Sequence, residues 1–466
     1  MNAVPGAAEP AAESPASFAR HLSRTLKLAG PIILSRVGVL MMTTLDVVVV
    51  GRAGAQELAF YVLGYAIYDS LLALMAGLSI GVPTLVSRSL GEGRDGVAGA
   101  IWRRGLLFAV LIGLALACLL QLGPWLFGLT GQDELLATGG GRVLGALAFG
   151  LPFFGMFLVS ATFLEALERP YIATVAVVIA NVVNLVLSVA LVFGFGPIPA
   201  LGAWGCALAT VITSAGLGIG LAGYVWFFLP GRERFGLRDP KPIGVPGARE
   251  QVVLGFAAGA SYALEAGSFG AITLIAGLLG TVQLAAVGVL FQLFALAFMV
   301  SFGIAGSTQV RVGNAWGRRN RGDIFRAGLV GFALSVVCSF ILSVVFLALP
   351  SSVIGLLTTD ETVIIASLPI VGWMVAALVA DGGQSVLNHA CRGRGDSWAP
   401  TLFHFISYWC VMVPVAYWLA VPTGGQGTGL YQAILLSSLI SLVLMGLRFR
   451  HLSSRPFGPT ENATGT

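Results

Sequence analysis

Four acidic side chains lie well inside long apolar stretches of this sequence: Asp46, Asp69, Glu265 and Asp381. A charged residue at the centre of a bilayer costs about 2.5–3.5 kcal/mol on insertion scales, so each carboxylate needs a reason. Carboxylate oxygens bind hard cations such as Na⁺, and burial favours the form of a carboxyl group that carries a proton. We therefore expect Asp46, Glu265 and Asp381 to bind a coupling cation or proton. The competing interpretation is a structural ion pair or hydrogen bond between helices.

Polar side chains recur at helical spacing around two of these acids and in one further apolar stretch. Residues at i, i+3, i+4 and i+7 share one face of a helix, so each set predicts a polar face turned away from lipid. Such stripes also occur as hydrogen bonds that join helices, and that alternative stays open. The three sets are Asp381, Gln384, Ser385 and Asn388; Ser261, Glu265 and Ser268; and, in a separate stretch, Asn181, Asn184 and Ser188.

Two further charges have less defined surroundings. Arg36 is the only basic residue that we place inside a predicted helix. It is interpreted as a cavity charge or as the partner of an embedded acid. Asp69 is interpreted as a cavity charge, with a structural bond to Tyr65 or Tyr68 as the alternative.

Pro31 lies near the start of the first apolar stretch. Proline removes a helix hydrogen bond and tends to kink the chain, so a bend there could reposition Asp46. The alternative is a proline in the first helical turn, where it is tolerated. His389 and His404 approach the same apolar stretches, and we interpret both as residues at a membrane boundary.

The composition places the chain in a membrane. Of its 466 residues, 57% are apolar and 10% are charged, whereas soluble domains carry about 25% charged residues. The 62 glycines suit helices that pack closely in lipid. The five cysteines form no metal or redox spacing and are interpreted as small apolar residues. The first 25 residues lack the apolar core of a secretory signal.

Apolar runs of about 20 residues, long enough to cross about 30 Å of hydrocarbon, recur along the chain. Because a spanning backbone must satisfy its own hydrogen bonds, we expect helices. The fold class predicted is therefore an all-α integral membrane protein with twelve transmembrane helices. The predicted spans are 28–50, 58–84, 105–123, 143–164, 172–194, 203–228, 251–278, 283–309, 328–349, 364–389, 402–420 and 428–447.

The distribution of basic residues predicts the orientation. With both termini cytoplasmic, 23 of the 26 Lys and Arg residues fall in inner segments. Arg52 and Arg142 fall in outer loops, and Arg36 lies within the first helix. This asymmetry follows the positive-inside rule and supports the helix count, since one missed helix would scramble it. It also accounts for the net charge of +5 without a nucleic-acid partner.

The two halves of the sequence are related. A shift of 226 residues aligns 28–91 with 254–317 without a gap and pairs several glycines, Gly77 with Gly303 and Gly91 with Gly317 among them. An offset of six helices preserves topology, so we predict a parallel repeat with a central cavity between two lobes in a V shape. The predicted domains are a tail (1–25), an N-lobe (26–228), a cytoplasmic linker (229–250), a C-lobe (251–447) and a second tail (448–466).

The sequence resembles the MATE family, the multidrug and toxic compound extrusion transporters, in its NorM-like branch. The resemblance covers roughly residues 25–450. The stretches that carry it are LAGP (28–31) with Asp46 and VGR (50–52), ERPYIATVAVVIANVVNLVLS (168–188), GAWGCALATVIT (202–213), SYALEAGSFGAITLIAGLLGT (261–281), VRVGNAWGRRN (310–320) and DGGQSVLNHACRGRGD (381–396).

The resemblance implies roles for individual positions. Asp46 matches the coupling aspartate of the N-lobe, Thr210 a nearby threonine, and Glu265 and Asp381 the acids of the C-lobe. Asn184 and Ser188 match a pair that more often consists of Asn with Asn or Asp. Ala377 stands where some NorM-like members have tyrosine. Asp69 and Arg36 match no motif of the family.

We therefore expect a secondary active antiporter that exports amphipathic, mostly cationic, drugs or toxic compounds in exchange for Na⁺ or H⁺. The expected location is the bacterial inner membrane, the expected form a monomer, and no cofactor is expected. Na⁺ at Glu265, Asp381 or Asp46 remains one option, because a carboxylate cluster serves either ion.

Two rival functions were weighed. A flippase for a lipid-linked glycan would favour a basic cavity, for which only Arg36 is placed. A membrane enzyme would need a nucleophile–base or metal constellation, and no HExxH, GxSxG or Walker A pattern is found in the sequence. We therefore do not expect an enzyme, and ATP is not expected to drive transport.

Overall fold

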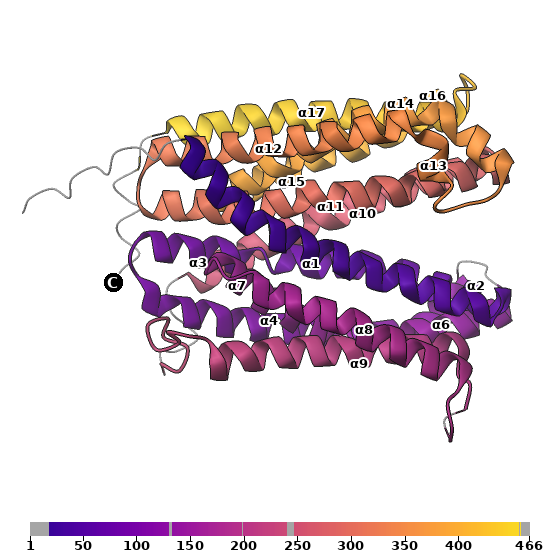
Figure 1. Cartoon of the computed structure of the whole chain (residues 1–466), viewed down its shortest axis with the longest axis horizontal. Coiled ribbons are helices and arrows are strands. Elements are labelled where there is room, and N and C mark those ends of the chain that lie inside the picture. Colours follow the sequence, from indigo (N-terminus) through magenta and orange to yellow (C-terminus); the bar gives the residue numbers. More distant parts are fainter. Residues whose placement is uncertain (1–17, 130–132, 198, 240–246, 456, 458–466) are drawn as a thin grey trace, which may run out of the picture.

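A computed structural model describes residues 18–129, 133–197, 199–239, 247–455 and 457, and places them almost entirely in helices (Figure 1). Eleven helices are long and apolar enough to cross a membrane, or twelve if the pair α6 and α7, bent by 41°, is counted as one span. The predicted all-helical membrane fold with twelve spans is confirmed at this level. The outermost parts of both predicted tails, and residues 240–246 of the predicted linker, lie outside the described residues.

The first half of the chain contains helices α1 to α9. Helix α1 begins at Phe18, ten residues before the predicted span, so it includes part of the predicted tail. The bounds are α1 Phe18–Ala53, α2 Ala55–Leu78, α3 Gly81–Gly91, α4 Ala98–Leu119, α5 Gly123–Leu129, α6 Glu134–Ala148, α7 Leu151–Ala166, α8 Tyr171–Phe193 and α9 Gly202–Gly223, with short 3-10 turns at Asp95–Val97 and Leu120–Leu122 and a π-helical turn at Tyr224–Phe228.

The second half contains α10 to α17. Several helices extend beyond the predicted apolar spans, because polar residues at their ends are covered by neighbouring helices and not by lipid. The bounds are α10 Ala248–Leu278, α11 Thr281–Gly317, α12 Arg321–Ala348, α13 Pro350–Ile354, α14 Glu361–Gly393, α15 Trp398–His404, a π-helical stretch Phe405–Met412, α16 Val413–Ala420 and α17 Gln426–Ser454.

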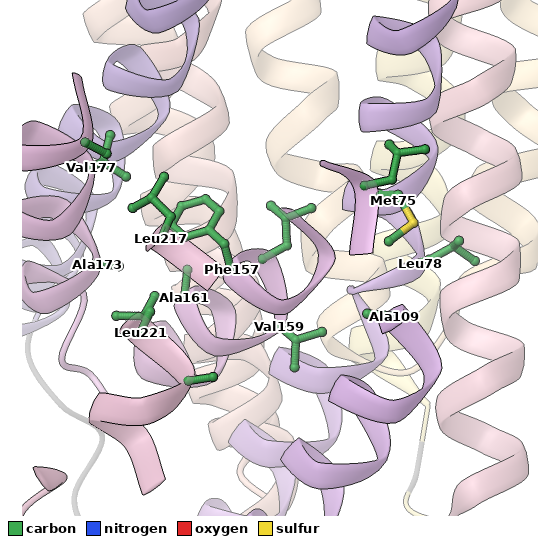
Figure 2. Close-up of a cluster of buried hydrophobic side chains, with 14 of the residues drawn as sticks. Met75, Leu78, Ala109, Phe157, Val159, Ala161, Ala173, Val177, Leu217 and Leu221 are labelled. Atoms are coloured by element: carbon green, nitrogen blue, oxygen red, sulfur yellow. The ribbon is translucent and has the colours of Figure 1, made fainter. Parts of the chain in front are cut away.

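Helix α7 forms the centre of the core of the first half (Figure 2). Its side chain Phe157 points toward Leu217 of α9, while Val159 faces the side where Met75 of α2 and Ala109 of α4 lie. Small residues allow this closeness: a Cβ atom on Gly113 would lie 2.5 Å from the Cα atom of Pro152. In the absence of a hydrophobic driving force between helices in lipid, such packing is a main source of association.

The two halves meet at positions related by the 226-residue repeat. A Cβ atom on Gly77 would lie 2.5 Å from Gly259, and a Cβ atom on Gly303 would lie 2.5 Å from Ile33. The second contact is the first one shifted by one repeat. An interface in which each contact has such a counterpart is self-complementary, as a two-fold relation requires. The repeat is therefore present in the structure as a pseudo-two-fold relation between the halves.

The halves are in direct contact at one end of the bundle, the end where Figure 1 labels α3. Gly91 and Gly317, again one repeat apart, contact each other there, with a Cβ atom on Gly91 placed 3.0 Å from Gly317 Cα. Gln309 donates a hydrogen bond of 2.9 Å to Thr84 across the same interface. No space is left for a side chain between these backbones, so this end is closed.

Helix α1 contacts both halves, and Figure 1 shows it running between them. Its first part packs against α11 and α14 in a cluster that contains Ala29, Ile304 and Val386. Further along, Gly38 O accepts a hydrogen bond of 2.9 Å from Asn181 of α8. A helix shared in this way can transmit a change in one lobe to the other.

Candidate functional site

Asp46 lies on α1 where four helices of the first half converge, and it is 1% exposed. Ser188 Oγ of α8 donates to Oδ1 at 2.9 Å. Thr210 Oγ1 of α9 donates to Oδ2 at 2.8 Å, and the Tyr61 hydroxyl of α2 does so at 3.3 Å. Asp46 has no ion-pair partner among the described residues. Its carboxylate is thus held by neutral hydroxyls, which leave a charge for a mobile cation to neutralise.

Asn184 lies one turn before Ser188 on α8 and is fully buried. Neither its amide oxygen nor its amide nitrogen has a hydrogen-bond partner among the described residues. A buried amide without partners costs free energy, so the position calls for an explanation. Asn181 differs, because its amide nitrogen donates to the backbone oxygens of Gly38 and Val177, both at 2.9 Å. It ties α8 to α1 and does not reach Asp46.

Asp381 forms a second buried cluster in the other half. Three groups donate to its Oδ1 atom: Ser438 Oγ of α17 at 3.0 Å, Tyr408 OH at 3.1 Å and Gln384 Nε2 at 3.2 Å. Tyr408 belongs to the π-helical stretch Phe405–Met412. Short π-helical segments occur frequently at functional sites. As at Asp46, hydroxyl and amide donors surround a carboxylate without a basic partner among the described residues.

His404 joins Asp381's neighbours to Glu265. Its Nδ1 atom lies 2.8 Å from Ser261 Oγ and 3.9 Å from a carboxylate oxygen of Glu265. Its Nε2 atom lies 3.1 Å from Gln384 Oε1 and 3.0 Å from Asn388 Nδ2. His404, the last residue of α15, is 1% exposed, so it is buried within the protein. It contacts the polar face predicted on α14 through Gln384 and Asn388.

His389 is likewise buried, at 3% exposed. Its Nδ1 atom donates to Ser385 O at 2.9 Å, so its Nε2 atom accepts from Tyr262 OH at 3.0 Å. The predicted apolar span ended at residue 389, whereas α14 continues to Gly393. Ser268, predicted beside Glu265, donates to that residue's backbone oxygen at 2.7 Å, so it does not bind the carboxylate.

Basic residues inside helices are more numerous than predicted. Arg104, Arg311 and Arg392 lie within α4, α11 and α14 and are buried, so the prediction that Arg36 is the only one is wrong. These helices extend beyond their predicted apolar spans, and the three arginines lie in the extensions. Arg392 is fully buried with its guanidinium carbon 4.8 Å from the centre of the Tyr262 ring. A cation above an aromatic face is stabilised by the ring.

Arg36 pairs with an acid that sequence analysis missed. Its guanidinium lies 3.1 Å from Glu165 of α7, and the Glu165 side chain is 5% exposed. Arg36 also lies over the Phe302 ring of α11, at 5.6 Å. Glu165 was passed over because it falls one residue beyond the predicted span 143–164. Arg36 therefore pairs with an embedded acid, and it also lines the cavity described below.

Pro31 lies in the interior of α1, since that helix begins at Phe18, so the interpretation as a first-turn proline is wrong. Its backbone oxygen accepts a hydrogen bond of 2.7 Å from Thr174 of α8. Proline at an interior position removes a backbone hydrogen bond, which makes this part of α1 easier to bend. A bend that moves Asp46 stays a prediction.

A cavity of about 310 Å³ lies between the two halves. This volume is in the range of small-molecule sites. Asp69 of α2 and Glu265 of α10 line it from opposite lobes, together with Arg36 and the polar residues Gln384 and Asn388. Much of its wall is aromatic, with the rings of Tyr65, Phe154, Tyr262, Phe269, Phe298 and Phe302.

Groups of three or more His, Cys, Asp or Glu side chains placed to hold a metal are absent from the part of the chain that the structure describes. Each cluster instead offers carboxylate, hydroxyl and amide oxygens, which are ligands for a hard cation or acceptors for a proton.

Comparisons with known proteins agree with this arrangement. The MatE family model matches residues 31–190 and 257–418, and the two stretches begin at the spacing of the internal repeat. A probable multidrug resistance protein NorM from Caulobacter vibrioides is 35% identical over 436 residues, which cover 93% of this chain and 92% of that protein. Another, from Bradyrhizobium diazoefficiens, is 31% identical, with 95% and 96% covered.

Solved structures share the fold. The crystal structure of the eukaryotic MATE transporter AtDTX14 superposes with a TM-score of 0.85 at 20% identity, covering 94% of this chain and 98% of that one. An outward-facing conformation of a multidrug resistance MATE family transporter also gives 0.85, at 16% identity, covering 95% and 100%.

Proposed function

The chain belongs to the MatE family of transporters, and on that premise we propose that it exports amphipathic organic cations in exchange for Na⁺ or H⁺. Multidrug efflux is the activity of the family and of the relatives described above, so the chain is a multidrug efflux transporter and not an enzyme. It needs no cofactor. The nature of the driving ion and the charge of the substrate are the parts that we propose.

The observation that carries the proposal is the presence of one buried carboxylate cluster in each half, with a cavity between them. Asp46 and Asp381 are each 1% exposed, and each receives three hydrogen bonds from neutral groups. Burying a charge that lacks a counter-charge is expensive. A cation or proton that enters from water removes this cost, so the clusters are suited to load and unload an ion.

The membrane potential supplies energy for such a cycle. One elementary charge that moves across 100 mV releases about 2.3 kcal/mol. If ion binding favours one arrangement of the lobes and substrate binding favours the other, the two movements are coupled in opposite directions. The closed interface at Gly91 and Gly317 is one of these two arrangements.

The predicted orientation assigns a side to that interface. The helices meet beside the loops that follow α3 and α11, which carry many of the basic residues counted as cytoplasmic. On this orientation the closed end faces the cytoplasm, and the cavity is accessible from outside. The proposed location is the inner membrane of a bacterium, with both described ends of the chain on the cytoplasmic side.

The cavity favours cationic aromatic substrates. It combines aromatic rings with two carboxylates, Asp69 and Glu265, and a cation over a ring gains about 0.5–2 kcal/mol. The rival function, a glycan-lipid flippase, is not favoured. Its anionic lipid would need free positive charge, but the Arg36 guanidinium is already bound to Glu165.

The experiment measures export of a fluorescent organic cation from proteoliposomes, with a Na⁺ gradient and a pH gradient imposed separately. We expect one gradient to drive export, and we expect Asp46→Asn, Glu265→Gln and Asp381→Asn each to abolish that dependence. Glu361→Gln, which removes an exposed acid at the start of α14, is the matched control. Normal gradient-driven export in all three variants would overturn the assignment.

A further inference from the structure

Asp69 lines the cavity but belongs to neither of the two carboxylate clusters, which are centred on Asp46 and Asp381. It lies on α2, its side chain is exposed, and it lines the cavity between the lobes. Its ionised group has no ion-pair partner among the described residues. Its carboxylate interacts with the Tyr65 hydroxyl one turn earlier on α2, and among the described residues no hydrogen bond joins it to Asp46.

The other charged groups of the cavity are committed to partners within the protein. Glu265 lies 3.9 Å from His404, which is hydrogen-bonded to Gln384 beside Asp381. Arg36, the basic residue of the cavity wall, lies 3.1 Å from Glu165. Asp69 contributes a negative charge to the cavity, and no Lys or Arg side chain among the described residues pairs with it.

The wall contributed by the other lobe is aromatic. Phe269, Phe298 and Phe302 line the same cavity as Asp69, and the rings of the last two lie in contact, tilted by 33° with centroids 6.0 Å apart. Tyr65, one turn before Asp69 on α2, adds a ring from the first lobe, fixed by a hydrogen bond of 2.8 Å between its hydroxyl and Thr43. A flat ring system can stack on these faces, while its positive charge reaches a carboxylate.

We propose that Asp69 binds the positive charge of the substrate, while the coupling ion occupies the separate carboxylates Glu265 and Asp381. This assignment rests on the proposed export of organic cations and adds the residue that selects for charge. Substrate and ion then bind at the same time to different acids, and their coupling comes from the movement of the lobes, without competition for one carboxylate. The preferred class is aromatic cations, with uncharged rings of equal size bound more weakly.

The test measures binding of two probes to the full-length transporter in lipid nanodiscs: ethidium, and an uncharged phenanthridine with the same ring system. For Asp69→Asn we expect the affinity for ethidium to fall by tenfold or more, with little change for the neutral probe. Asp69→Glu should restore binding to within about threefold of the original protein. Glu361→Gln, which removes an exposed acid outside the cavity, is the matched control and should leave both affinities unchanged.

Three results would overturn the proposal. The first is unchanged ethidium binding in Asp69→Asn. The second is an equal loss of affinity for both probes, which would mean that Asp69 shapes the cavity and does not discriminate between charged and uncharged ligands. The third is competition between ethidium and the coupling ion that disappears in Asp69→Asn, because both would then share this carboxylate. Failure of the unaltered protein to export any organic cation would instead refute the proposed function itself.

Discussion

Replacing Gly317 with alanine should hold the two lobes apart at their closed end. The residue ends α11, where it faces the end of α3. A Cβ atom on Gly317 would lie 2.1 Å from the backbone oxygen of Arg88 and 2.9 Å from the backbone nitrogen of Glu92. Ordinary contacts begin at 3.4 Å. Because the atoms it meets belong to backbone, no side-chain rotation can relieve the overlap, and the helices must separate.

The size of the effect follows from the cost of overpacking, about 1–3 kcal/mol. Such a cost lowers the ratio of closed to open lobes by about 5- to 150-fold. The pseudo-two-fold relation predicts the same result for Gly91→Ala, whose Cβ atom would lie 2.2 Å from Asn314 O. Two changes on opposite lobes should therefore have equivalent consequences.

The assay is a distance measurement between spin labels on Arg94→Cys, after α3, and Arg321→Cys, at the start of α12, in a protein otherwise free of cysteine. We expect Gly317→Ala to shift the distribution to longer distances and to slow export. The control is Gly372→Ala in α14, where a Cβ atom would meet nothing within 4 Å. Gly372→Ala has the same gain in helix propensity as Gly317→Ala, up to about 1 kcal/mol, but creates no overlap. An unchanged distance distribution in Gly317→Ala would refute the packing argument.

Three further predictions concern the buried polar groups. Asn184→Leu should raise the melting temperature of the ion-free transporter, because it removes a buried amide without hydrogen-bond partners. Gradient-driven export should fall in the same variant. A lower melting temperature would contradict this prediction. Tyr408→Phe removes one of three hydrogen bonds to Asp381, so the ion-free state loses about 1–3 kcal/mol and maximal export should drop about tenfold or more in vesicles. Arg36→Ala should destabilise the protein by about 3–5 kcal/mol, because it leaves Glu165 buried without its cation. Adding Glu165→Gln to this variant should restore much of the lost stability, as measured by thermal unfolding.

The arrangement of helices could be predicted from the sequence because lipid imposes a simple rule. Apolar runs of fixed length, a one-sided distribution of Lys and Arg, and a glycine pattern that repeats after 226 residues together predicted twelve spans and two related halves. The ends of the helices could not be predicted in this way. Glu165 and Arg392 lie beyond the apolar runs, yet neighbouring helices bury both residues.

The acids at the centres of the clusters were also accessible to sequence analysis, since a carboxylate in an apolar run is conspicuous. The residues that donate hydrogen bonds to these acids were harder to predict from the sequence. Ser188 was found through helical spacing and Thr210 through family resemblance. Tyr61, Tyr408 and Ser438 belong to other helices and are ordinary residues in their own stretches. A helical period reports which residues share a face, but it does not report which face of another helix lies opposite.

The central claim is that movement of substrate and movement of an ion through the buried carboxylates are coupled in opposite directions. Reciprocity allows a direct test, in which a gradient of organic cation is imposed on proteoliposomes without any ion gradient and the flux of Na⁺ or H⁺ is recorded. We predict that the substrate gradient drives one ion in the opposite direction, and that Asp381→Asn abolishes this flux. Substrate movement with no accompanying ion flux in the unaltered protein would contradict the account.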